Sequence, residues 1–404
     1  MKFEQALLGK VFLIIFACIF IQVIYKCIIT TPSEGDSVDY HIPIAKSFIS
    51  GNIINPAHNL AVKHTKYYPG NTEALLSVFY LEGIPLGLFN AFGILTLLFI
   101  CIRLGIIFRL NIHTSIIFAV TICTLNAILR WADTQIADIW LLNFFLLSLI
   151  FLEKPKKSAK YFLKLGLALG LLIGSKYSAP FIAIILLIFY AKKILPFVNI
   201  SRMFSFLIPI SIFGFSWYIR NILLTGNPLY PQAFLFFKGG QSAILNLTVA
   251  KVITGSLSGL LSTLNSFVSE FLAWSLIIPG VIIQYFRTKE TRKLKLPFRL
   301  LFLAFVLTLF FINLPSANQT HIMTSSFRYF LSALVPAILF VFIYFDKIKK
   351  VELLSVMSLA SLLLVEFPLG YYPKLFIATI PVGLIIYIWG YKFICEKLGK
   401  RFLL

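Results

Sequence analysis

Apolar stretches alternate with short polar or basic breaks along almost the whole chain. A helix that crosses the hydrocarbon core of a bilayer needs about 20 mostly apolar residues, and these stretches approach or reach that length. They predict twelve transmembrane helices, at residues 11–30, 82–102, 113–130, 136–152, 161–174, 178–191, 203–224, 269–286, 300–314, 329–345, 352–366 and 375–391. The pattern therefore predicts an all-α polytopic membrane protein with one membrane domain over residues 1–404.

The composition supports a membrane protein and excludes a soluble or fibrous one. Hydrophobic residues make up 59% of the chain and charged residues only 13%, with a mean hydropathy of +0.92. Soluble domains carry about 25% charged residues, which they need to cover their surface. The sequence contains no Walker loop, no GxGxxG turn and no zinc motif, which argues against ATP-driven transport.

The net charge of +21 would indicate a nucleic-acid partner in a soluble protein. Here most of the 36 Lys and Arg residues lie in short clusters between apolar stretches, as expected for cytoplasmic loops. We therefore expect no nucleic-acid partner. The placement of these Lys and Arg clusters predicts that the N- and C-termini are cytoplasmic, in a bacterial inner (plasma) membrane. The first span is expected to stay uncleaved.

Two long segments, at about 30–81 and 225–270, are predicted to be external loops. The first should contain short juxtamembrane helices and holds Asp36 and Asp39. Residues three apart share a helical face, so both carboxylates could point into one cleft and accept a proton from a sugar hydroxyl. The alternative is that Asp36 or a neighbouring serine only caps a short helix.

Other external polar residues are candidates for sugar or phosphate binding. Tyr40 and His41 follow the acidic pair, and Glu73 ends a stretch of basic and tyrosine residues in the same loop. An ordinary solvated loop, capped by Asn71, is the alternative for this stretch. Asp138 lies near the external end of the fourth predicted span, where it either complements the helix dipole or takes part in chemistry.

Three cations are predicted outside, against the overall charge bias: Lys176, Arg220 and Arg328. A fixed cation at headgroup level suits an anion such as a lipid phosphate. The alternative is that these side chains simply reach to the membrane interface.

Six segments, in this order, resemble the GT-C glycosyltransferases. The resemblance is to the bacterial RgtA/B/C/D-like branch, which is related to protein mannosyltransferases and aminoarabinose transferases. The segments are DSVDYHIPIAKSFISGN, YYPGNTE, DTQIADI, LGLALGLLIGSKYSA, SWYIRNILLTGNPLYP and SSFRYFLSALVPA. The resemblance covers about the first 235 residues well and the remainder loosely.

The resemblance implies a GT-C fold and transfer of a sugar from a polyprenyl-phosphate donor to a glycan or lipid-linked acceptor at the outer face. It implies that Asp36 is the catalytic base, with Asp39 as an alternative because the family often shows an adjacent acidic pair. Asp138 would orient the acceptor or, together with Asp36, hold a divalent metal ion. The three cations would stabilise the departing lipid phosphate. The remaining residues implied in binding are Tyr40, His41, Glu73, Asn227, Tyr230 and Tyr329.

Two alternative functions remain open from the sequence. An O-antigen polymerase or ligase also has about a dozen spans, although its chemistry is usually placed in a late external loop. A lipid-linked sugar flippase or transporter would show mid-span charges and repeat symmetry between its halves. Neither feature is evident here.

Overall fold

The computed structural model describes residues 2–56, 60, 63–233, 235–240, 247–288, 294, 296–317 and 324–365. The predicted span at 375–391 and the C-terminal tail lie outside these residues. The α-helices are α1 (Lys2–Ile29), α2 (Ile42–Ile49), α3 (Asn71–Leu81), α4 (Leu88–Ile107), α5 (Ile112–Cys123), α6 (Asn126–Leu129), α7 (Asp138–Glu153), α8 (Ala159–Ile173), α9 (Ala179–Ile194), α10 (Ile200–Ile210), α11 (Ser216–Thr225), α12 (Val249–Gly255), α13 (Leu257–Phe271), α14 (Trp274–Arg287), α16 (Phe298–Asn313), α17 (Leu331–Lys347) and α18 (Val351–Leu363).

Short elements join these helices. Two π-helical turns, η1 (Ser37–His41) and η4 (Ser211–Phe215), and three 3₁₀ turns, η2 (Lys63–Tyr67), η3 (Leu195–Phe197) and η5 (Thr324–Phe330), lie between them. Two very short strands, β1 (Leu247–Thr248) and β2 (Pro315–Ala317), pair antiparallel.

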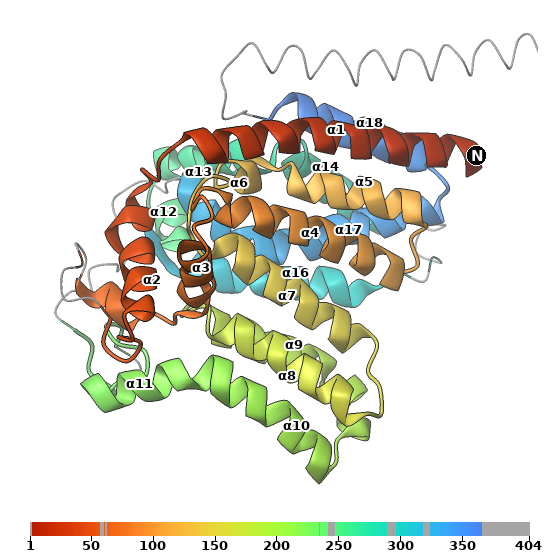
Figure 1. Ribbon diagram of the computed structural model, residues 1–404. Helices are drawn as coiled ribbons and strands as arrows, with labels where there is room; N and C mark the ends of the chain where they lie inside the picture. The colour runs from red at the N-terminus through yellow and green to blue at the C-terminus, as the bar shows by residue number, and fades with distance from the viewer. Residues whose placement is uncertain are drawn as a thin grey trace, which may run out of the picture.

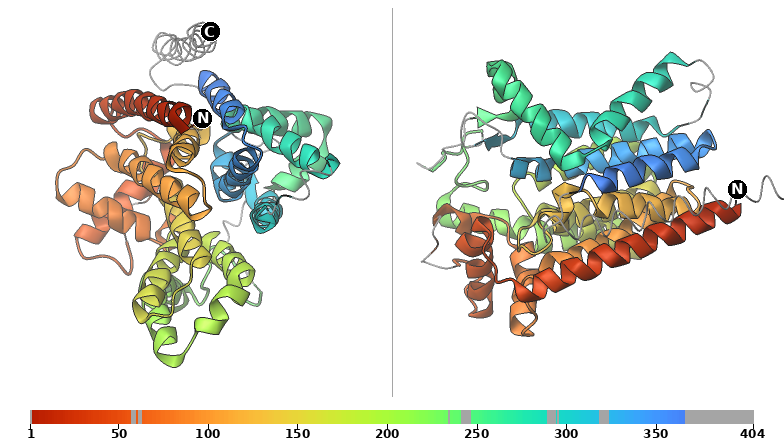
Figure 2. Two further views of the ribbon diagram at one scale, coloured as in Figure 1. Left: turned by 90° about the vertical axis from the view of Figure 1, so that its right-hand side faces the viewer. Right: turned by 90° about the horizontal axis from the view of Figure 1, so that it is seen from above.

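The long helices run side by side as a bundle, with α2 and α3 gathered at one end (Figures 1 and 2). We call this end the loop end, and the opposite end the Glu153 end. Five helical segments are long and apolar enough to cross a membrane, and a sixth is obtained if α13 and α14, bent by 96° at their junction, form one span. Those five are Gln5–Ile29, Leu88–Ile107, Ala179–Phe197, Ile200–Thr225 and Ser326–Lys347.

The chain is thus an all-α, multi-pass membrane protein, as its pattern predicts. Each of the first eleven predicted spans overlaps a helix of the bundle, and three shorter apolar helices, α5, α16 and α18, lie within such spans. The number of twelve stays a prediction.

Helix α17 is the centre of the bundle. Every residue from Leu331 to Phe345 is buried, and α5, α7, α14, α16 and α18 pack around the helix. A helix that is apolar on all sides is typical of such an enclosed position or of a membrane span. Its N-terminal end, with η5 before it, is therefore fixed at the loop end.

The glycine-rich helix α8 packs directly on the backbone of the α10–η4 segment. Gly166, Gly170 and Gly174 are four residues apart and so share one face. A Cβ atom at any of the three would collide with a carbonyl oxygen of that segment, from Phe206, Pro209 or Phe213. Small residues at this spacing allow the close approach of helices in membranes.

Helix α13 has an apolar exposed face and a polar buried face. Its buried side chains include Thr263, Ser266 and Glu270. Most of its exposed side chains are apolar (Leu257, Leu261, Leu264 and Val268), with Ser258 and Asn265 as the polar exceptions. This inverted pattern is typical of a helix that contacts lipid. The last third of the predicted external segment 225–270 therefore folds as helix α13, with a mostly apolar exposed face.

One buried carboxylate joins three helices at the Glu153 end. The Glu153 side chain, at the end of α7, is 4% exposed and accepts hydrogen bonds from Lys193 at 2.7 Å and from Tyr190 at 2.5 Å, both on α9. Arg299, in the first turn of α16, also pairs with it. The same three helices line a cleft at the loop end, so this cluster holds their other ends together.

Glu153→Ala should destabilise the fold, because it leaves Lys193 and Arg299 without their shared carboxylate. Both cations are partly exposed, so we expect a loss of about 1–2 kcal/mol rather than the 3–5 kcal/mol of a fully buried pair. The apparent melting midpoint of the purified protein should fall by roughly 2–5 °C. Lys156→Ala, at an exposed position in the next loop, is the control; an equal midpoint for both variants would contradict this role.

Candidate functional site

The start of the first loop is held in place by a carboxylate and a hydroxyl. Glu34 accepts hydrogen bonds from the backbone N–H groups of Asp36 (3.2 Å) and Ser37 (2.8 Å), and from the Ser37 hydroxyl (2.8 Å). The Ser37 hydroxyl in turn accepts one from the backbone N–H of Gln135 at 3.0 Å. Glu34, not Asp36, satisfies the first amides of this turn, and Asp36 makes no side-chain cap hydrogen bond. The alternative role of Asp36 as a helix cap is therefore wrong.

The Asp36 carboxylate instead faces a buried arginine from the far end of the chain. Arg328 Nη2 donates to Asp36 Oδ2 at 2.7 Å, across 292 positions of sequence. The Nε of the same guanidinium lies 3.1 Å from Asp138 Oδ2, as an ion pair without hydrogen-bond alignment. Arg328 and Asp138 are 8% and 4% exposed, whereas Asp36 is 38% exposed. Arg328 thus links an accessible acid to a buried one.

Lys176 completes this cluster from the hinge between α8 and α9. Its Nζ donates to Asp138 Oδ1 at 2.9 Å and lies 3.9 Å from the centre of the Tyr329 ring. Two acids and two cations give the cluster no net charge, which lowers the cost of burying it. Lys176 is the more exposed of the two cations, at 29%. It is therefore the cation that an entering anion can reach.

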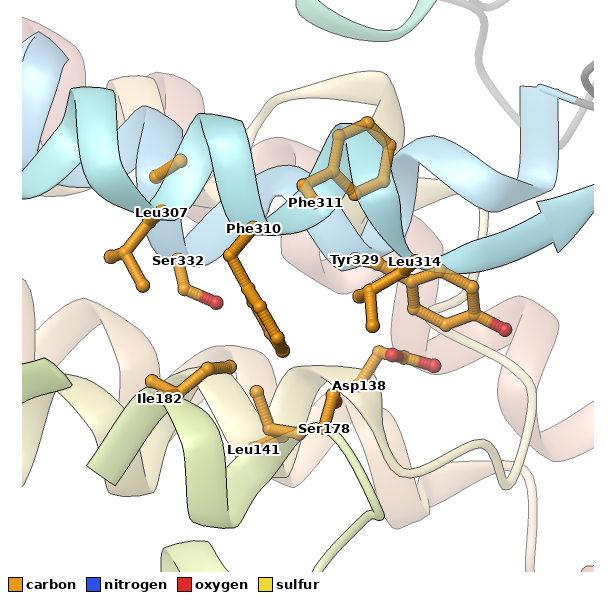
Figure 3. Close-up of a pocket in the computed structure, with 11 residues that line it drawn as sticks. Asp138, Leu141, Ser178, Ile182, Leu307, Phe310, Phe311, Leu314, Tyr329 and Ser332 are labelled. Carbon is orange, nitrogen blue, oxygen red and sulfur yellow. The ribbon is translucent and has the colours of Figure 1, made fainter. Parts of the chain in front are cut away.

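A narrow apolar cleft runs from this cluster between α7 and α9 on one side and α16 and α17 on the other. Asp138 and Tyr329 lie at its polar end, and the remaining lining residues are mostly apolar, including Ile182, Leu307 and Phe310. Figure 3 shows the Asp138 carboxylate and the Tyr329 hydroxyl together at this end, with the apolar side chains on the two walls. The cleft volume is about 10 Å³, so these side chains must move apart to admit a ligand.

Asp39 is not part of the cluster. It lies in the π-helical turn η1, where the backbone repeats at i to i+5 and is wider than an α-helix. Residues three apart therefore do not share a face as closely as an α-helical turn predicts. Within the described ranges, Asp39 is half-buried and makes no ion pair or hydrogen bond.

His41 and Glu73 form a buried pair next to this turn. His41 Nδ1 lies 2.6 Å from Glu73 Oε1, and the Thr72 hydroxyl donates to Glu73 Oε2 at 2.9 Å. Both side chains are under 10% exposed. The contact ties η1 to α3, so both residues act on the shape of the loop.

Tyrosine side chains fill the space between η1 and the end of the loop. The Tyr40 ring packs against the His41 ring at a tilt of 39°, with the ring centres 4.2 Å apart, and meets Tyr68 edge-on at 5.8 Å. Burial raises the pKa of Tyr68 to about 12, and the nearby Tyr329 and Asp36 add to the shift. Burial also raises the pKa of Tyr40, again with a contribution from Asp36. Both phenols therefore stay neutral across the physiological range and can donate hydrogen bonds.

Asn71 fastens the end of the first loop to the glycine-rich helix, a role that the sequence did not reveal. Its side-chain N–H₂ donates to the carbonyls of Phe213 (2.7 Å), Leu171 (3.1 Å) and Gly170 (3.3 Å), and its oxygen accepts from Trp217 Nε1 at 2.9 Å. The residue is 9% exposed. In the sequence, the PGN turn before α3 predicts only a helix cap.

Arg220 lies outside the ion-pair cluster. Its guanidinium donates to the Tyr68 carbonyl at 3.1 Å and to Asn221 Oδ1 at 3.0 Å, and lies 5.0 Å from the Trp217 ring. Its Nη1 is buried and has no hydrogen-bond partner among the described residues. Arg220 therefore supports the loop through the Tyr68 backbone, and both N–H groups of its Nη1 remain without a partner among the described residues.

Asn227 and Tyr230 shape the segment after α11. Asn227 Nδ2 donates to the carbonyls of Gln232 (2.8 Å) and Lys238 (2.9 Å), so its side chain is occupied within its own loop. The Tyr230 ring packs edge-on against Tyr67 at 4.8 Å. Both residues lie beside the loop end and stabilise the loop itself.

The donor set at the cluster does not fit a divalent metal ion. Within the described part of the chain, no three His, Cys, Asp or Glu side chains gather to hold one. Asp36 and Asp138, the two residues named for a metal, are instead joined by the Arg328 guanidinium. A bound cation would have to displace that guanidinium.

The sequence matches no family model and no curated protein. The structure is similar to ArnT from Cupriavidus metallidurans bound to undecaprenyl phosphate, with a TM-score of 0.57 and 14% identity over 95% of this chain and 72% of that chain. The apo form of that protein has a TM-score of 0.56 at 14% identity, over 87% of this chain and 63% of that one.

An oligosaccharyltransferase from Archaeoglobus fulgidus in its apo form is also similar, with a TM-score of 0.52 and 13% identity over 94% of this chain and 54% of that one. At this identity the likeness shows the fold and not the activity. Both neighbours are GT-C transferases, so the prediction from the six sequence segments is confirmed at this level: the chain has the fold of the GT-C superfamily.

Proposed function

We propose that the chain is a membrane glycosyltransferase that moves a sugar from a polyprenyl-phosphate donor to a glycan or lipid-linked acceptor. The observation that carries the proposal is the cluster of Asp36, Arg328, Asp138 and Lys176 at the end of an apolar cleft. An accessible carboxylate, a reachable cation and an apolar cleft that opens for the lipid are what such a transfer requires. The GT-C fold supports it.

The cleft between α9 and α16 suits the lipid part of the donor. Its walls are apolar, and its polar end carries Tyr329 beside Lys176. ArnT, which has the same fold, was crystallised with undecaprenyl phosphate. In this chain a lipid phosphate at the polar end would meet Lys176 first, because Arg328 is buried between two acids.

Asp36 is the base in this proposal. It is the more exposed acid of the cluster, and Asp138 is enclosed by Lys176 and Arg328. The acceptor oxygen attacks the anomeric carbon and gives its proton to Asp36. The bond from that carbon to the phosphate oxygen breaks, and its electron pair leaves with the phosphate, whose charge Lys176 stabilises. A single displacement inverts the anomeric configuration.

The proposal also fixes an orientation in a bacterial inner membrane. The loop end faces outward, where no nucleotide is needed because the donor is already activated. The basic breaks predicted to be cytoplasmic then lie at the Glu153 end, with Arg299 and Lys193. Lys176, Arg220 and Arg328 lie toward the opposite side.

Deletion of the gene should raise the amount of polyprenyl-phosphate sugar in the membrane and lower the mass of a surface or lipid-linked glycan by one sugar. Mass spectrometry of both extracts measures this and identifies the sugar. A mass change of whole repeat units would favour a polymerase or ligase. No covalent change in either extract would favour a flippase.

Asp36→Asn should reduce sugar transfer by at least about 100-fold, because the amide cannot accept the proton. Asp39→Asn is the matched control on the same turn and should stay within about twofold of the wild type, since Asp39 has no partner in the described ranges. Transfer is measured by complementation of the deletion strain and by release of polyprenyl phosphate, with a melting midpoint for each variant. Full activity in Asp36→Asn, or an equal loss in Asp39→Asn, contradicts the assignment.

Chelation should not stop the reaction. Because Arg328 occupies the position between Asp36 and Asp138, transfer by purified protein in excess EDTA should remain within about twofold of the untreated rate. Magnesium and manganese added back serve as controls. Loss of transfer in EDTA with recovery on either ion would show that a metal replaces the guanidinium contact.

A further inference from the structure

A second, polar pocket lies beside the Arg328 cluster, on the other side of Trp131. It has a volume of about 200 Å³ and is lined by Thr31, Ser33, Glu34, Arg130, Trp131, Asp133, Thr134 and Gln135. These residues come from the start of the first loop and from the segment between α6 and α7. The proposed reaction, as described so far, uses none of them.

The pocket is one layer of side chains from the proposed base. The Arg328 guanidinium, which binds Asp36, lies 4.8 Å from the centre of the Trp131 ring. Glu34, on the pocket wall, accepts the backbone N–H of Asp36 at 3.2 Å. Asp36 is therefore linked through Arg328 to Asp138 at the end of the apolar cleft, and through Glu34 to the wall of this polar pocket.

The charged residues of the pocket wall already have partners. Asp133 pairs with Lys26 at 2.7 Å, and Arg130 pairs with the buried Glu270 of α13 at 3.0 Å. Glu34 is held by the amides that follow it. An incoming anion would have to compete with these contacts, and an incoming cation likewise.

Uncharged groups of the pocket wall can still bind a ligand. Thr31 and Ser33 are exposed, and within the described part of the chain their hydroxyls make no hydrogen bond. Trp131 adds an aromatic ring to the lining, whereas the Thr134 hydroxyl is already used, because it donates to the Trp131 carbonyl at 2.9 Å and accepts from Asn90 Nδ2 at 3.3 Å. Hydroxyls beside an aromatic ring recognise the polar edge and the apolar face of a sugar. The volume is below the 300 Å³ or so of drug-sized sites and suits a single ring.

We propose that this pocket binds an uncharged sugar ring of the acceptor, so that the acceptor reaches Asp36 from the side opposite the donor lipid. The inference rests on the proposed function, because it assigns the acceptor as a neutral glycan rather than a phosphate-bearing group. It also gives Trp131 a role as the partition between the two substrates.

The test is sugar binding to the full-length protein in nanodiscs of phosphatidylethanolamine and phosphatidylglycerol, followed by saturation-transfer NMR. Maltoside and glucoside detergents are avoided because their head groups are sugars. The probes are methyl α-glucopyranoside and methyl β-galactopyranoside, with glucose 6-phosphate as the anionic comparison. The wild type should transfer saturation to at least one neutral glycoside, and more strongly than to glucose 6-phosphate.

Ser33→Phe should lower that signal by about fivefold or more, because a phenyl ring covers the pocket from an exposed loop position. Thr31→Phe is the second variant, from the other exposed hydroxyl. Ser50→Phe, at an exposed position at the end of α2, is the matched control and should keep the wild-type signal. Unchanged signals in both pocket variants, a stronger signal for glucose 6-phosphate, or none from the neutral glycosides would overturn the assignment.

Asp36→Asn separates this inference from the proposed function. Asp36 does not line the pocket, so the variant should bind the glycoside like the wild type although its sugar transfer is reduced by at least about 100-fold. If the wild type binds the glycoside but gene deletion changes neither donor nor glycan, the transferase proposal fails and the pocket stands. If deletion shows the loss of one sugar but the glycoside does not bind, only the pocket assignment fails.

Discussion

The site depends on one buried arginine that holds two acids from distant parts of the chain. Arg328 binds Asp36 of the first loop and pairs with Asp138 at the start of α7. A guanidinium suits this task because it presents several N–H groups in a fixed plane, where an ammonium is a single point of charge. It lies just before α17, the most enclosed helix of the bundle, so the rigid centre of the protein positions the loop chemistry.

The cluster also explains how charged side chains can be buried in a protein that is 59% hydrophobic. With Lys176 added, the two acids and two cations cancel, and each buried group has an oppositely charged neighbour. Opposite charges are also paired at the Glu153 end, where Glu153 binds Lys193 and Arg299. Both clusters join α7 to its neighbours, one beside the cleft and one where the helices end.

The spans could be predicted because apolar length is a local property, and the first eleven predicted spans all overlap helices. Which of Asp36 and Asp39 joins the ion-pair cluster could not be predicted, because that depends on a π-helical turn and on an arginine 292 positions away. Spacing counted for an α-helix placed both acids on one face. The sequence identifies Lys176, Arg328 and Asp138 as separate candidates. Their pairing could not be predicted, because it depends on the tertiary structure.

Other residues that shape the site have no local sequence pattern that would predict their role. Asn71 was interpreted only as a cap, although its side chain joins the loop to two other segments. The sequence singles out acidic and amide residues in the segment that holds Arg130 and Trp131, but not these two, because their pocket also needs residues of the first loop. Arg220 was grouped with the other cations by its charge, yet the fold gives it a backbone carbonyl as partner.

The most direct test of the central interaction is a double-mutant cycle between Asp36 and Arg328. Melting midpoints would be measured for Asp36→Asn, Arg328→Gln and the double variant in the same nanodiscs. If the two side chains bind each other, the double variant should melt close to the less stable single variant, with a coupling of about 1 kcal/mol or more. Losses that simply add would show that the two residues do not interact and would contradict the account.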